Sequence, residues 1–185
     1  SMMTLVQDLV TSVAQKALGT LQVGSGDAAV DLSLPWRTVP YKDLVREKAG
    51  ADWFELPVEK AREKARGMGL DIPSEWGFIE ITQEVYEKLI EKTLMNPTFV
   101  TRLPVELVPL AKRCVDDASV VDVFELVMRG REIAPGYTEL NDPLDQRKRF
   151  EDQAGADASK IDEDFLTALE HGMPPAGGMG IGIDR

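Results

Sequence analysis

The sequence predicts an α+β fold in which helices pack on a mainly antiparallel sheet. Two observations predict this class. Apolar and polar residues alternate on both sides of an Arg-Gly pair within 123–138, which is typical of a β-hairpin. Apolar residues recur at helical spacing within 4–18 and 82–95, which indicates amphipathic helices. A chain of 185 residues is long enough for one domain with a sizeable core.

Residues 1–50 predict the first part of the core, with a helix followed by a strand. Gly19 is a natural C-terminal cap for a helix whose apolar residues recur at Leu5, Leu9, Val13 and Leu18. We expect this helix to pack on the sheet through that stripe. The remaining elements expected here are an alternating strand at 30–34, ended by Pro35, and a short helix at 41–50.

Residues 51–95 are more charged and predict two helices. The first, at 57–69, carries acidic and basic residues at i,i+4 spacing. The second runs from Thr82, a candidate N-cap, to about Met95. The basic side chains of the first helix could contact RNA, but a solvated helix face is the preferred interpretation; they are Lys60, Arg62, Lys64 and Arg66.

The hairpin brings acidic side chains to one face of the sheet. With a two-residue turn at Arg129-Gly130, Leu126 faces Ile133 and Val127 faces Glu132. Alternation then predicts two sets: Phe124, Leu126 and Ile133 on the core face, and Glu125, Val127, Glu132 and Ala134 on the other. Glu125 and Glu132 become diagonal neighbours roughly 7 Å apart. Such a pair of like charges suggests a cation between them, and oxygen ligands suit Mg²⁺ with substrate phosphates. A solvated strand face is the alternative.

Pro135-Gly136 predicts a β-bulge, because proline cannot donate to a regular ladder. One inserted residue moves Tyr137 and Glu139 onto the face of Glu132. That face then holds three carboxylates and an aromatic ring. The pattern is consistent with a socket for a cationic substrate and a metal-bound phosphate.

The last third of the chain predicts two helices and a glycine-rich strand. Asn141 or Asp142 caps a helix that runs to about Gln153, and a second helix spans 162–170. His171 follows that helix, where a dipole or loop role is favoured over a general base. In the final strand the glycines share one face and the larger residues the other: Gly178, Gly180 and Gly182 against Met179, Ile181 and Ile183. The bare face admits either a flat ring or a closely packed helix.

Composition narrows the possible classes of function. An apolar content of 43% and a charged content of 29% are typical of a soluble globular protein, and no apolar run has the length of a membrane span. The lone Cys114 excludes an internal disulfide and favours a cytoplasmic location. The net charge of −11 makes the chain by itself a poor binder of nucleic acid.

Three stretches carry a resemblance to a known family. They are NPTFVTRLPVELVPLAKR (96–113), GREIAPGYTELNDPLDQRKRFEDQ (130–153) and DFLTALEHGMPPAGGMGIGIDR (164–185). Together they resemble the catalytic domain of class II lysyl-tRNA synthetases, from after the second family motif to the middle of the third. The resemblance implies that 1–50 begins the catalytic core, 51–95 is a small helical insertion, and 96–185 completes the core.

The resemblance also implies roles for particular residues. Glu125 and Glu132 match the glutamates that hold Mg²⁺ around ATP, and Arg185 matches an arginine on the ATP phosphates. Gly180 and Gly182 lie in the strand beside which the adenine binds. Glu139 matches the acid that pairs with the lysine ammonium, and Tyr137 an aromatic along the lysine stem. Pro135 departs from the family, where an asparagine that contacts the substrates is usual.

The implied function is ATP-dependent activation of lysine and its transfer to tRNA by a homodimeric enzyme. The family's first two motifs are absent from the chain, so we expect these residues alone to be inactive, to leave most tRNA contacts elsewhere, and to self-associate through exposed edges. Two alternatives stay open: a paralogue that attaches an amino acid to a protein lysine, and a non-catalytic interaction module. An aspartate-specific relative is disfavoured, because Glu139 suits a cationic substrate.

Overall fold

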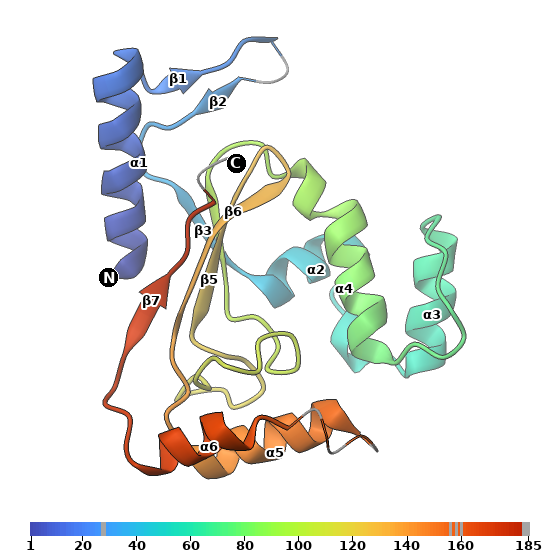
Figure 1. Ribbon diagram of the computed structural model, residues 1–185. Coiled ribbons are helices and arrows are strands. Elements are labelled where there is room, and N and C mark those ends of the chain that lie inside the picture. The colour runs from blue at the N-terminus through green and yellow to red at the C-terminus, as the bar shows by residue number, and fades with distance from the viewer. Residues whose placement is uncertain (27–28, 156, 158, 160, 183–185) are drawn as a thin grey trace.

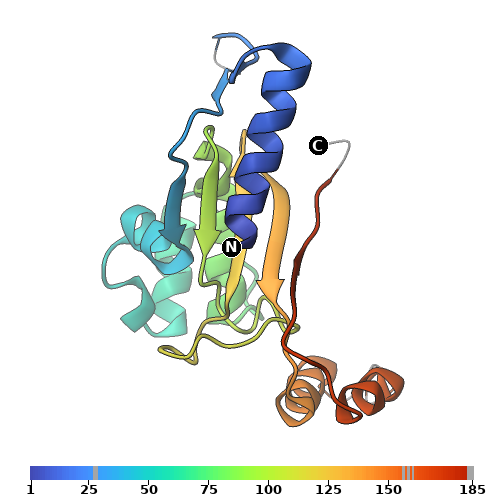
Figure 2. The same ribbon diagram turned by 90° about the vertical axis from the view of Figure 1, so that its left-hand side faces the viewer.

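The computed structural model has an α+β architecture built around one five-stranded sheet, as the sequence predicted. It describes residues 1–26, 29–155, 157, 159 and 161–182. The strand order is β3-β4-β5-β6-β7, with β3 and β4 parallel and the other neighbours antiparallel. Helix α1 covers one face, α2 to α4 cover the other, and α5 and α6 lie at one end (Figures 1 and 2).

The elements follow in chain order. They are α1 (Met2–Leu18), β1 (Gln22–Val23), β2 (Val30–Asp31), β3 (Arg37–Pro40), α2 (Tyr41–Ala49), η2 (Trp53–Glu55), α3 (Val58–Gly67), α4 (Phe78–Leu89), η3 (Glu91–Thr93), β4 (Thr98–Thr101), β5 (Val123–Met128), β6 (Arg131–Thr138), α5 (Pro143–Ala154), α6 (Glu163–Glu170) and β7 (Gly177–Met179). Among the helices of the described residues, none combines the length and apolar character that a membrane crossing requires.

Helix α1 packs on the sheet through a different stripe from the one predicted. Gly19 ends it in the left-handed conformation (φ 69°), as expected. The buried side chains are Val6 and Ala14, whereas Leu5 is 53% exposed and Val13 is 55% exposed. The sequence carries two neighbouring apolar stripes, and the one with the smaller side chains faces the sheet. The expectation that the leucine stripe packs on the sheet was therefore wrong.

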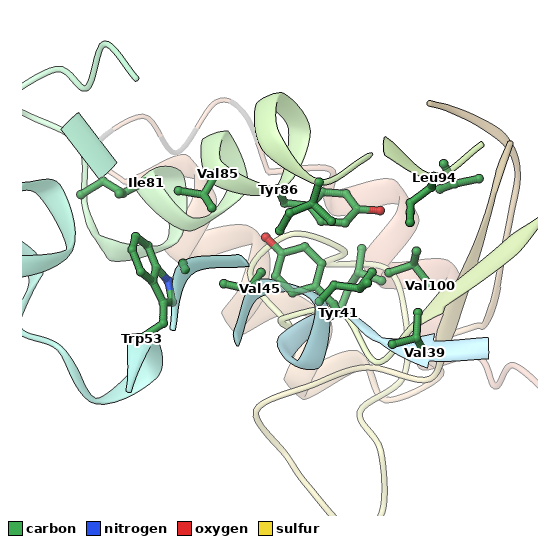
Figure 3. Close-up of a cluster of buried hydrophobic side chains, with 14 of the residues drawn as sticks. Val39, Tyr41, Val45, Trp53, Ile81, Val85, Tyr86, Leu94 and Val100 are labelled. Carbon is green, nitrogen blue, oxygen red and sulfur yellow. The ribbon is translucent and has the colours of Figure 1, made fainter. Parts of the chain in front are cut away.

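Helices α2, α3 and α4 share one hydrophobic core with the sheet. Tyr41, Trp53 and Tyr86 are its largest aromatic members, and the cluster continues into β3, β4 and β5 (Figure 3). The indole Nε1 of Trp53 donates to the hydroxyl of Thr82 at 3.0 Å. Thr82 is thus a buried residue within α4 and not its N-cap, because the helix begins earlier, after Gly77. The division of the chain at residues 50 and 95 remains a prediction.

The β5–β6 hairpin has the predicted two-residue turn but a differently placed bulge. Arg129 (φ 53°) and Gly130 (φ 64°) both adopt the left-handed conformation, as a type I′ turn requires. Val127 faces Glu132 as expected, but Leu126 faces Ala134, so Ile133 is the extra residue. The prediction of a bulge at Pro135 was wrong. The carbonyl of Pro135 accepts a hydrogen bond from the amide of Gly180, just after β7, and therefore points away from β5. Because the N–H and C=O of one strand residue point to the same side, the amide that proline lacks would also point away from β5.

Helices α5 and α6 lie at the end of the sheet where β6 ends and β7 begins. Asp142 caps α5 by accepting hydrogen bonds from the amides of Leu144 and Asp145, as predicted. Arg149 of α5 is only 5% exposed and donates to the carbonyls of Pro109 and Ala111. This network ties α5 to the irregular segment before β5 and supports the residues that follow β6.

Candidate active site

The bulge at Ile133 brings the predicted acidic and aromatic side chains to one face of the sheet. Directly opposed residues in an antiparallel pair share a face. Val127 opposes Glu132, and Val123 opposes Tyr137, so both lie on the face of Glu125. The shared face was predicted correctly, although the bulge that produces it lies nearer the turn. The same shift moves Ala134 to the opposite face, against Leu126, so its predicted placement was wrong.

Glu125 is a partly buried acid in the middle of this face. Its strand neighbours are Val100 on β4 and Pro135 on β6, and neither can neutralise a carboxylate. Burial first, and then the charges of Glu132, Glu91 and Glu87, raise the pKa of Glu125 to about 7. Burial and the neighbouring carboxylates disfavour the ionised form of Glu125, and a bound cation would stabilise it.

The helical segment supplies two of these charges, which the sequence analysis missed. Glu91 belongs to η3 and Glu87 to α4, and both lie close enough to Glu125 to raise its pKa. Burial, followed by the charges of Glu87 and Glu132, raises the pKa of Glu91 itself. Their spacing of four residues marks them as neighbours on one helical face, but nothing in the sequence connects that face with the hairpin.

These carboxylates fit a magnesium ion that also binds a substrate phosphate. In the described part of the chain, no three acidic, histidine or cysteine side chains converge closely enough to hold a metal ion by themselves. Mg²⁺ usually takes one or two protein carboxylates and completes its shell with water and phosphate oxygens. Glu125 and Glu132 match that requirement, and their negative surroundings favour a cation.

Tyr137 lies near the end of β6, and Glu139 follows the strand, before α5 begins. Burial raises the pKa of both side chains, and the charge of Glu139 raises the pKa of Tyr137 further. The amide of Glu139 donates to the carbonyl of Ala176 at 2.9 Å, which fixes its backbone. Glu139 lies four positions after Pro135, the partner of Glu125, which corresponds to about 13 Å along extended chain. The face therefore has an acidic end near the turn and a second acid beyond the aromatic ring.

The glycine-rich strand borders this face and leaves its β7 edge open. Gly180 and Gly182 donate from their amides to the carbonyls of Pro135 and Ile133. Met179 and Ile181 pack into the opposite cluster with α1, so the predicted alternation is confirmed over the described residues. A Cβ added to Gly178 or Gly180 would meet no atom within 4 Å. No helix packs there, so the close-packing interpretation was wrong for these two positions.

The remaining residues singled out from the sequence divide into three groups. Arg185 and Ile183 lie outside the described residues. His171 ends α6 on the surface, where its Nδ1 lies 2.8 Å from the carbonyl of Thr167. The four basic residues of α3 are all engaged within the chain: Lys60 with Glu63, Lys64 with Asp52, Arg62 with the Trp76 carbonyl and Arg66 with the Ile72 carbonyl. Their contacts favour the structural interpretation over RNA binding.

Comparison with known proteins identifies the family. A family model described as tRNA synthetases class II (D, K and N) matches residues 1–185. The chain belongs to this family. It is 47% identical over 190 residues to the lysine–tRNA ligase of Bacillus subtilis and covers 38% of that protein's length. It is 44% identical to the lysine–tRNA ligase of Carboxydothermus hydrogenoformans, of which it covers 39%.

A third relative, the lysine–tRNA ligase of Trichormus variabilis, is 45% identical over 192 residues, and the chain covers 34% of that protein's length. In each comparison at least 99% of the chain is matched, so the likeness includes the helices of 51–95 as well as the hairpin. The chain thus spans little more than a third of the length of the curated class II relatives it matches.

Proposed function

We propose that the chain is part of the catalytic domain of a lysine–tRNA ligase. The observation that carries the proposal is the common face of Glu125, Glu132 and Tyr137, in a chain 47% identical to such an enzyme. In the first step the lysine carboxylate attacks the α-phosphate of ATP, which gives lysyl-adenylate and releases pyrophosphate. In the second, the 3′-terminal ribose hydroxyl of tRNA attacks the lysyl carbonyl and releases AMP.

Glu125 and Glu132 bind the magnesium that accompanies ATP. When bound, Mg²⁺ neutralises negative charge on the phosphates and orients them. The two carboxylates would place that charge on the face of the sheet that α2 to α4 partly cover, and the backbone of Gly180 and Gly182 borders the surface on which the adenine lies. We assign Arg185 to the phosphates, as the family resemblance implies. Catalysis then depends on positioning and charge neutralisation, with no protein nucleophile.

Glu139 selects the substrate by pairing with the lysine ammonium, and Tyr137 packs along the aliphatic stem. The burial that raises the pKa of Glu139 supports this role, because a partly desolvated carboxylate discriminates strongly for a cationic partner. Pro135 offers no side-chain hydrogen bond at the amino-acid end. The backbone and the neighbouring elements must therefore provide the polar contacts there.

Several properties of the intact enzyme follow from the same proposal. The net charge of −11 supports tRNA contacts mainly through other parts of the longer protein. We also propose a cytoplasmic location and a homodimeric enzyme. For the chain by itself we propose self-association through the exposed stripe of α1, which light scattering over a range of concentrations tests.

The assignment of Glu139 is tested in the full-length protein by lysine-dependent ATP–pyrophosphate exchange. Glu139→Gln removes the charge that pairs with the ammonium, so the KM for lysine should rise about a hundredfold or more while the KM for ATP stays nearly constant. Glu151→Gln makes the same chemical change at an exposed position on α5 and serves as the control. An unchanged lysine requirement in the Glu139 variant would refute the role of this residue. The 185-residue chain is expected to be inactive in this assay.

A further inference from the structure

Asn141 was a candidate cap for α5, but Asp142 makes that cap, and the Asn141 side chain has other partners. It is half-buried. Its Nδ2 donates to the carbonyl of Met173 at 3.3 Å, and its Oδ1 accepts from the Nζ of Lys112, also at 3.3 Å. A lysine ammonium can only donate and a carbonyl can only accept, so the two partners fix the orientation of the amide between them. The nitrogen of Asn141 therefore faces the connection that joins α6 to β7.

That connection, residues 171–176, contains two successive prolines, Pro174 and Pro175. Neither has a backbone N–H, and a residue that precedes proline favours extended conformations. The stretch from Met173 to Ala176 thus has few donors of its own and little freedom to bend. Its position depends on what holds its two ends.

Both ends of this stretch are bonded to the segment that carries Glu139. The carbonyl of Ala176 accepts from the backbone amide of Glu139 at 2.9 Å, and the carbonyl of Met173 accepts from the side chain of Asn141. Together with the chain between Glu139 and Asn141, these two bonds close a ring. The acid at the predicted amino-acid end of the site is a member of that ring.

The other side of the same segment is bonded through backbone atoms. The amide of Leu140 donates to the carbonyl of Leu110 at 2.9 Å, and the amide of Lys112 donates to the carbonyl of Thr138 at 2.8 Å. Such bonds form whatever the side chains are. The ring is the part of this framework that is closed by one side chain.

We propose that Asn141 is a positioning residue for substrate recognition, and that by closing the ring it fixes where the Glu139 carboxylate meets the ammonium of lysine. This inference rests on the proposed function of Glu139. Without the bond from Asn141, the connection is held only at Ala176, and the backbone of Glu139 can shift with it. A displacement of about 1 Å in a binding site can cost about 100-fold in rate.

The test is lysine-dependent ATP–pyrophosphate exchange by the full-length protein that carries Asn141→Asp. Aspartate has nearly the same shape and keeps an oxygen for Lys112, but it places an oxygen against the Met173 carbonyl and cannot donate to it. The KM for lysine should rise about 10- to 100-fold while the KM for ATP stays nearly constant. The preference for lysine over ornithine, whose ammonium lies one methylene closer to the carboxylate, should fall.

Asn96→Asp is the matched control, because it makes the same chemical change at a different end of the sheet. The Oδ1 of Asn96 accepts from the backbone amide of Asp31, and a carboxylate keeps that acceptor. This variant should leave both KM values and the preference for lysine unchanged.

A double-mutant cycle shows whether Asn141 acts through Glu139. In a protein that already carries Glu139→Gln, Asn141→Asp should raise the KM for lysine no further, because residues that act together are not additive. An equal rise with and without the Glu139 substitution would overturn the inference. A purely structural role would lower the active fraction, and hence kcat, with an unchanged KM for lysine and an unchanged preference over ornithine, which would also overturn it.

Two further variants cover the remaining outcomes. If Asn141→Asp folds poorly, Asn141→Ala removes the same bond without bringing two oxygens together, and an unchanged KM for lysine in that variant would contradict the proposal. Glu139→Gln alone tests the proposed function. If it leaves the lysine requirement unchanged, the role of Glu139 is wrong and the inference fails with it, whereas an effect of Glu139→Gln without one of Asn141→Asp refutes the inference alone.

Discussion

Replacing Glu125 by glutamine should stabilise the metal-free chain at alkaline pH. Because the pKa of Glu125 is raised from 4.5 to about 7, the folded state holds this proton more tightly than the unfolded state. Between those two values the folded chain binds more protons than the unfolded one, so its stability falls as pH rises. At about 1.4 kcal/mol per pH unit, the ionised Glu125 lowers the free energy of unfolding above pH 7 by at most about 3 kcal/mol. Glutamine has the same shape and never ionises.

The assay is urea denaturation at pH 5 and pH 8 in the presence of a chelator. At pH 5 the two proteins should have similar free energies of unfolding, whereas at pH 8 Glu125→Gln should be the more stable by up to about 3 kcal/mol. Other acids shared by both proteins cancel in this comparison. A variant that is less stable than the unchanged chain at pH 8, or a difference that does not depend on pH, would refute the reasoning. Added Mg²⁺ should narrow the difference at pH 8, because a cation stabilises only the charged residue.

Three further predictions concern stability and nucleotide binding. Gly136→Ala should lower the free energy of unfolding by about 1–3 kcal/mol, because the added Cβ would lie 2.4 Å from the Phe124 ring. Gly180→Ala has open space around the added Cβ, so it should leave stability unchanged and weaken only ATP binding, measured in the full-length protein by calorimetry. Arg149→Ala should destabilise the chain by about 1–3 kcal/mol in urea denaturation, because the Ala111 carbonyl loses its donor and the Asp145 carboxylate and the Pro109 carbonyl each lose one of two donors. Tyr86→Phe removes an unpaired hydroxyl and should stabilise the metal-free chain by about 1 kcal/mol, whereas Tyr41→Phe loses a bond to Gln83 and should destabilise it similarly.

Each of these predictions has a result that would contradict it. Gly136→Ala with unchanged stability would mean that the Phe124 ring can move aside. Full stability after loss of Arg149 would mean that the segment before β5 does not depend on α5. If the two tyrosine variants change stability by the same amount and sign, the difference between their hydroxyls is not as the structure shows it.

Local physical preferences account for the parts that sequence reasoning predicted well. The Arg-Gly pair determines a type I′ turn because glycine adopts positive φ without strain, and strand alternation then places Glu125 and Glu132 on one face. Gly19 and Asp142 end and begin helices through bonds made within a few residues. Two errors arose where several local solutions were equally good. They concern the stripe of α1 that is buried and the position of the bulge, which lies at Ile133 and not at Pro135.

The sequence by itself determined the fold class, the hairpin and the acidic and aromatic residues of the candidate site. These depend on periodicity and on turn chemistry, which act over a few residues. Only the tertiary structure decided which stripe of α1 is buried, that the glycine face is open, and that Glu91 and Glu87 add negative charge near Glu125. The physical reason is that burial and charge depend on which elements meet in space, and segments distant in the sequence come together only through packing of the shared core.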